Sequence, residues 1–135
     1  MKRYADEPSH ESIRSLDGLI ASAIARVEVP AALWRKQRIG ELSSSDVEVL
    51  VTAFRAELIG TPTRPPGFAA VPLDTEVLDL AAEATATHSL RAYDAVQLAS
   101  ALVARSADPS CERFACFDDE LRDAAARSGF GLIPV

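Results

Sequence analysis

The segment from Leu90 to Val103, LRAYDAVQLASALV, constrains the fold more than any other part of the chain. Its apolar residues recur at the spacing i, i+3, i+4 and i+7, which is typical of one buried face of an α-helix; they are Ala95, Leu98, Ala99 and Leu102. Asp94 falls in the first turn of this predicted helix, at the edge of the apolar stripe. Two interpretations of Asp94 stay open. Either its negative charge is stabilised by the positive end of the helix, or it is a metal-binding carboxylate at the lip of a cleft.

The length and composition of the chain indicate how many domains it forms and where it is located. Its 135 residues suffice for one domain with a core, so we expect a single domain over residues 1–135. No run of about 18 apolar residues predicts a membrane span. The first residues, MKRYADEPSHES, contain no apolar signal segment, and two cysteines are too few for a disulfide framework. We therefore expect a cytoplasmic protein that does not associate with membranes.

The net charge of −6 at pH 7 limits the ways in which the chain can bind nucleic acid. It argues against non-specific binding of DNA or RNA through a broad basic surface. It does not exclude a nuclease, because bound cations can neutralise an acidic catalytic site. A phosphate-binding loop is not expected, since no glycine-rich run follows a predicted strand.

Apolar runs and turn residues divide the chain into alternating strands and helices. Expected strands cover residues 19–21, 68–73, 113–117 and 131–135, and expected helices start near Pro8, Ser22, Ser43, Asp74 and Asp118. Pro30 predicts a kink or a late start in the second of these helices. The alternating order predicts an α/β domain with a mostly parallel sheet.

Three acidic residues are candidates for one site at an edge of this sheet, where ligands of open parallel sheets collect. Asp118 directly follows the strand at 113–117, and Asp94 begins the helix that leads into that strand. Glu28 comes from an earlier helix, between two valines. Crowded carboxylates repel one another unless a cation lies among them, and oxygen ligands favour Mg²⁺ or Mn²⁺. The alternatives are a helix N-cap for Asp118 and a solvent-directed carboxylate for Glu28.

Four stretches resemble, in their order, the PIN-domain family and within it the VapC-type toxins of bacterial toxin–antitoxin pairs. They are KRYADEP, ARVEVPAALWR, LRAYDAVQLASAL and FACFDDEL, followed by a final GLIPV strand. The resemblance implies a parallel sheet flanked by helices and a Mg²⁺-dependent endoribonuclease. It implies that Glu28, Asp94 and Asp118 are the catalytic and metal-binding residues. It also implies an RNA substrate, a cognate antitoxin and a homodimer.

Two departures from the family pattern qualify this resemblance. Family members often have Thr or Ser two places before the last acid, where this chain has Cys116. They also usually begin with a strand that ends in an Asp, whereas this sequence begins at Met1, just after that strand. We therefore expect the N-terminal strand to be missing, either because the start is assigned late or because the chain is truncated. We expect the first explanation, because the remaining pattern is intact.

The missing acid leaves a second function open: an impaired PIN-fold module that only binds an antitoxin partner. The apolar helix from Val47 to Leu58, with the first helix, would then form the binding groove. Three basic residues after Glu28 also have two interpretations; they are Arg35, Lys36 and Arg38. They contact an RNA backbone, or they form a solvated helix face.

Overall fold

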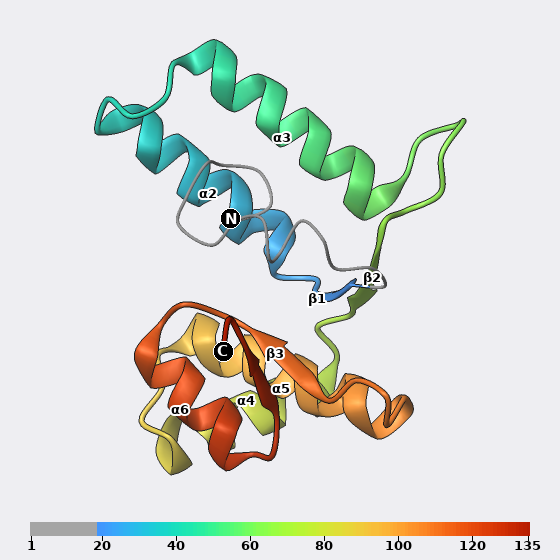
Figure 1. Cartoon of the computed structure of the whole chain (residues 1–135), viewed down its shortest axis with the longest axis vertical. Coiled ribbons are helices and arrows are strands. Elements are labelled where there is room, and N and C mark those ends of the chain that lie inside the picture. Colours follow the sequence, from blue (N-terminus) through green and yellow to red (C-terminus); the bar gives the residue numbers. More distant parts are fainter. Residues whose placement is uncertain (1–18) are drawn as a thin grey trace. The chain divides into compact units, whose positions relative to one another are not determined.

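The computed structural model describes residues 19–135, which form five helices and four short strands (Figure 1). In chain order they are β1 (Leu19–Ser22), α2 (Ala25–Arg38), α3 (Ser44–Ile59), β2 (Phe68–Val71), α4 (Thr75–Thr87), α5 (Ala92–Ala107), β3 (Arg113–Ala115), α6 (Asp119–Arg127) and β4 (Gly131–Ile133). The α/β class is thereby confirmed, whereas a PIN-like arrangement stays a prediction. The helix expected near Pro8 lies outside the described residues.

The described strands form two separate two-stranded sheets, which differs from the single sheet that we expected. β1 pairs with β2, and β3 pairs in parallel with β4, with Phe114 opposite Leu132. The strands are shorter than their apolar runs. β2 stops at Val71 because Pro72 has no N–H to offer a sheet, and β3 stops before Asp118, which caps the next helix. Among residues 19–135, no strand joins the two pairs.

The chain divides into two compact units. The first contains residues 25–69 with α2 and α3, and the second contains residues 20–24 and 70–135 with the remaining helices and the β3–β4 pair. The single domain expected for residues 1–135 stays a prediction.

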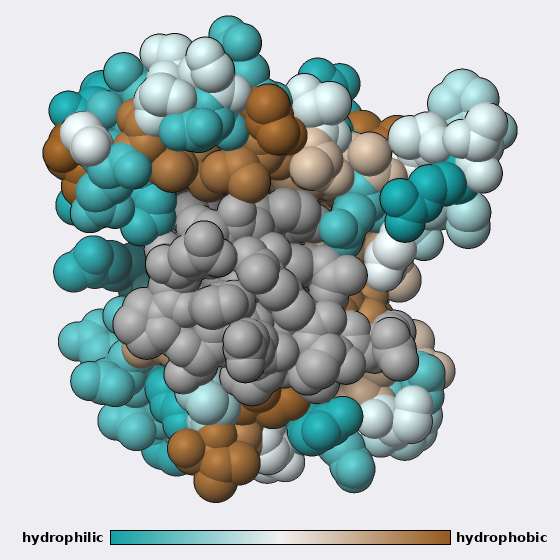
Figure 2. All heavy atoms as spheres, turned by 45° about the horizontal axis from the view of Figure 1, so that its top comes forward, coloured by the Kyte–Doolittle hydropathy of each residue, from teal (hydrophilic) through white to brown (hydrophobic). Residues whose placement is uncertain are grey.

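Helices α2 and α3 pack against each other in the first unit. Their shared core consists of Val29, Leu33, Val47, Phe54 and Leu58. α2 begins at Ala25 and continues through Pro30, so the late helix start that Pro30 predicted is not found. Proline cannot donate a main-chain hydrogen bond within the helix, and the burial of Val29 and Leu33 offsets that loss. Apolar side chains also reach the surface of this hairpin (Figure 2), and Val49 is 68% exposed.

The cap expected at the start of α3 is confirmed. The Ser43 hydroxyl accepts a hydrogen bond from the Asp46 amide at 3.0 Å, and the Asp46 carboxylate accepts one from the Ser43 amide at 3.1 Å. This reciprocal pair satisfies two amides that a helix start leaves free.

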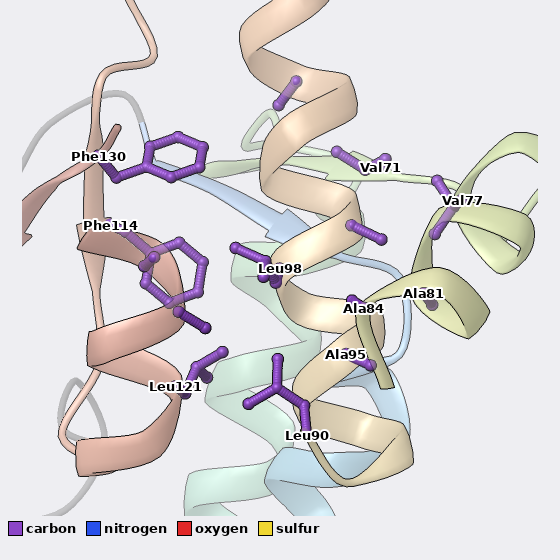
Figure 3. Packing of buried hydrophobic residues seen from close by; sticks show 14 residues of the cluster. Val71, Val77, Ala81, Ala84, Leu90, Ala95, Leu98, Phe114, Leu121 and Phe130 are labelled. Carbon is purple, nitrogen blue, oxygen red and sulfur yellow. The ribbon is translucent and has the colours of Figure 1, made fainter. Parts of the chain in front are cut away.

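Helix α5 is the centre of the second unit, where it packs against α4 and α6 (Figure 3). Its residues Ala95, Leu98 and Ala99 are fully buried, as the apolar stripe predicted. Small side chains on α4 and α6 let these helices approach α5 closely; they are Ala81, Ala84, Ala124 and Ala125. Phe114 of β3 and Phe130 before β4 close one side, with ring centroids 5.8 Å apart. The second unit therefore has its own apolar core, on which the start of α5 is held.

Candidate acidic site

Asp94 lies half-buried in the first turn of α5. The helix begins after Arg91, whose side chain makes no capping hydrogen bond. Burial is the largest effect on the Asp94 carboxyl and raises its pKa, and the negative charges of Asp118 and Glu120 raise it further. The positive charge of Arg91 opposes these effects. Asp94 therefore lies in surroundings that disfavour its negative charge.

Asp118 is exposed and begins the next helix, α6. Its Oδ1 atom accepts a hydrogen bond from the Leu121 amide at 2.9 Å, so the N-cap interpretation is confirmed. This role does not exclude a ligand role, because a carboxylate offers about four acceptor positions and the cap uses one.

Asp94 and Asp118 thus come from the starts of two different helices and interact electrostatically. Both belong to the second unit. Glu28 is half-buried on α2, in the first unit, so its place in a three-acid cluster stays a prediction. Within residues 19–135, no three histidine, cysteine, aspartate or glutamate side chains gather closely enough to hold a metal ion.

Two carboxylates nevertheless suit one kind of cation. Mg²⁺ keeps several water ligands and is commonly held by one or two protein carboxylates together with substrate phosphates. The negative charges of Asp94 and Asp118 repel each other, and a divalent cation bound between them would relieve this repulsion. The chemistry of this oxygen-donor pair therefore fits Mg²⁺ or Mn²⁺.

Cys116 lies next to the two acids, in the place where a hydroxyl residue was expected from the family. Burial, the largest effect, raises the pKa of its thiol to about 11. A hydrogen bond with the Asp118 main chain and the positive charge of Arg122 act in the opposite direction. The thiol therefore stays protonated at neutral pH, which makes it a poor nucleophile and a poor metal ligand.

Sequence reasoning missed three charged residues around the acid pair: Arg91, Glu120 and Arg122. Arg91 precedes Asp94 by three positions, and Arg122 follows Asp118 by four. Residues at these spacings lie close together at a helix start or along one helix face, so the spacing was the signal available in the sequence.

The basic residues of α2 differ in their surroundings. Arg35 and Arg38 are exposed, whereas the Lys36 ammonium forms an ion pair with the Glu41 carboxylate at 2.9 Å. A contact of this segment with RNA stays a prediction. If it forms, the two exposed arginines are better suited to it than Lys36.

Comparison with known proteins gives no assignment: neither the protein-family models nor the curated proteins contain a match to this chain. The resemblance to PIN domains remains an interpretation of the motif residues alone. Each described helix falls short of the length and apolarity that crossing a bilayer requires.

Proposed function

We propose that this chain is a Mg²⁺- or Mn²⁺-dependent endoribonuclease of the PIN-domain class, similar to VapC-type toxins. The observation that carries the proposal is that Asp94, half-buried at the start of α5, interacts electrostatically with Asp118 at the start of α6; burial first, and then the charge of Asp118, raise the pKa of Asp94. A half-buried carboxyl group with a raised pKa that interacts with a second carboxyl group from a separate element is typical of sites built for a cation or for acid–base chemistry. The order of the four PIN-like stretches in the sequence adds support for RNA as the substrate.

Asp94 and Asp118 would hold the cation, with Glu28 as the third proposed ligand. A cation bound there lowers the pKa of water and neutralises negative charge on a phosphodiester. Asp94 must lose its proton to serve as a ligand, and Arg91 favours that loss. Asp118 is held in place by its hydrogen bond to the Leu121 amide. Asp118 is thus held by the start of α6, whereas Asp94 is a half-buried carboxyl group whose pKa is raised.

Substrate binding calls for positive charge near the acids, because an RNA backbone is anionic. Arg91 supplies such a charge, since its side chain is exposed and interacts electrostatically with Asp94. We expect Arg91 to contact a phosphate close to the scissile bond. We expect Arg35 and Arg38 to contribute backbone contacts that carry no sequence information.

The direct test is cleavage of a mixed RNA pool by the purified chain with Mg²⁺, with Mn²⁺ and with EDTA. We expect cleavage in both metals, none in EDTA, and none with Asp94→Asn or Asp118→Asn. Glu83→Gln is the matched control, because Glu83 is an exposed acid on α4 outside the pair. Full activity of Asp94→Asn, or cleavage that persists in EDTA, would contradict the proposal.

A second candidate function is an inactive PIN-like module that binds an antitoxin-type partner. Exposed apolar residues on α2, on α3 and directly after α2 suit a helical partner segment; they are Val27, Val49 and Ile39. A stable complex with the product of an adjacent gene, together with no cleavage in any cation, would support this function over the nuclease. A homodimer stays a further expectation, and sedimentation of the purified chain tests it.

A further inference from the structure

Arg122 of α6 connects the carboxyl ends of both strands of the β3–β4 pair. Its side chain is half-buried. Nη1 donates a hydrogen bond to the Cys116 carbonyl at 3.0 Å, and Nη2 donates one to the Pro134 carbonyl at 2.7 Å. Cys116 is the first residue after β3, and Pro134 is the first residue after β4. The Arg122 guanidinium therefore connects, by one hydrogen bond each, the two chain segments that leave this sheet.

The segment that Arg122 holds includes the start of α6, where Asp118 lies. The Cys116 amide donates to the Ile133 carbonyl at 3.1 Å, and the Cys116 thiol donates to the Asp118 carbonyl. Cys116 is thus fixed at its amide, its carbonyl and its sulfur, and Asp118 follows two positions later. Because Arg122 also belongs to the first turns of α6, its two contacts tie the start of this helix to the sheet edge.

We propose that Arg122 is a positioning residue that holds Asp118 in place opposite Asp94. This role requires no contact between Arg122 and either carboxylate. It acts through the main chain at Cys116, and thereby sets the separation of the two acids. The consequence for catalysis rests on the proposed nuclease function, whereas the consequence for the geometry of the acid pair does not.

The proposed role needs arginine in particular. A guanidinium presents several N–H donors in one rigid plane, so it can bond to two carbonyls from different strands at once. A lysine has a single nitrogen on a flexible stem and cannot reproduce both contacts with the same geometry. Arg122→Lys keeps the charge but loses the two-point connection, which separates positioning from simple charge effects.

The test compares Arg122→Lys and Arg122→Gln with Arg127→Gln. Arg127 is a matched control because it is an exposed arginine on the same helix, and its Nε donates to the Asp123 carbonyl one turn earlier. We expect both Arg122 variants to lower kcat about 10- to 100-fold, the usual loss when a residue that orients metal ligands is replaced. The Mg²⁺ concentration for half-maximal cleavage should rise, while KM for RNA stays nearly unchanged. Arg127→Gln should behave as the unmodified protein.

A second readout keeps the inference separate from the nuclease proposal. Asp94 lies on α5, so its amide resonance reports on the acid pair without direct contact with Arg122. We expect this resonance to shift in Arg122→Lys and Arg122→Gln and to stay unchanged in Arg127→Gln. If the unmodified protein cleaves no RNA, the nuclease proposal fails, and the resonance alone decides the positioning role. An unchanged Asp94 resonance in folded Arg122→Lys, or full cleavage by that variant, would overturn the inference.

Discussion

Asp94 at the start of α5 interacts electrostatically with Asp118 at the N-cap of α6, although the two residues come from different helices. Two properties of the second unit follow from this relationship. Burial and, after it, the charge of Asp118 raise the pKa of Asp94, and Asp118 combines a structural role with an electrostatic one.

Asparagine and alanine at position 118 should separate these two roles. Asp118→Asn keeps an N-cap acceptor, whereas Asp118→Ala removes it and should lower the free energy of unfolding by about 1 kcal/mol. Both variants remove the negative charge, so both should lower the pKa of Asp94. Carbon-detected NMR of the Asp94 carboxyl and denaturant unfolding measure the two effects. An equal loss of stability in both variants would show that the cap hydrogen bond contributes little.

Asp94→Asn should stabilise the cation-free protein at neutral pH. The raised pKa means that folded Asp94 binds its proton more tightly than unfolded Asp94, so stability falls as the pH rises from its ordinary value through its raised value. The uncharged asparagine avoids this loss. The gain should be below about 1 kcal/mol at pH 7, because the side chain is only partly buried, and should vanish near pH 3.

Thermal unfolding between pH 3 and pH 8 measures this difference. Asp79→Asn is the control, because Asp79 is an exposed acid on α4. A gain for Asp94→Asn that stays constant at every pH would mean that proton binding at Asp94 is not its source.

Leu98→Ala should be among the most damaging single changes in the second unit. Leu98 is fully buried at the centre of α5, so its truncation removes apolar contacts and leaves a cavity, at a cost of about 3 kcal/mol. Leu78 of α4 is 50% exposed, and Leu78→Ala should cost less than about 1 kcal/mol. Urea unfolding of both variants gives the comparison, and similar losses would argue against the packing of α5 described above.

Cys116 should resist alkylation in the folded protein. Burial raises the pKa of its thiol to about 11, so the reactive thiolate is scarce at pH 8. In a Cys111→Ser background, mass spectrometry should detect no iodoacetamide adduct after an incubation that fully modifies the urea-unfolded chain. Rapid modification of the folded protein would mean that the thiol is more accessible or more acidic than its surroundings indicate.

Local sequence signals predicted the helices well, because each start carries its own chemistry. Ser43 and Asp74 precede α3 and α4 as side-chain caps, and Asp118 does the same for α6. The apolar spacing around Leu98 identified the buried face of α5 before its neighbours were known. These features depend on residues within one or two turns, so they are readable without the fold.

Features that depend on distant partners were not predicted. The strand runs indicated one sheet, but strand pairing depends on the whole fold, and the described residues form two separate pairs. Arg122 was overlooked because its partners are main-chain carbonyls at Cys116 and Pro134, which carry no sequence signature. Asp94 and Asp118 interact electrostatically, whereas their role as a metal site and the place of Glu28 beside them stay predictions.

Binding of Mn²⁺ to the purified chain, followed by electron paramagnetic resonance, tests most directly whether Asp94 and Asp118 hold a cation. We predict one bound Mn²⁺ per chain, displaced by excess Mg²⁺, and loss of that binding in both Asp94→Asn and Asp118→Asn, with Glu83→Gln unchanged. Equal Mn²⁺ binding by all four proteins, or no binding by any of them, would contradict a cation site at this acid pair.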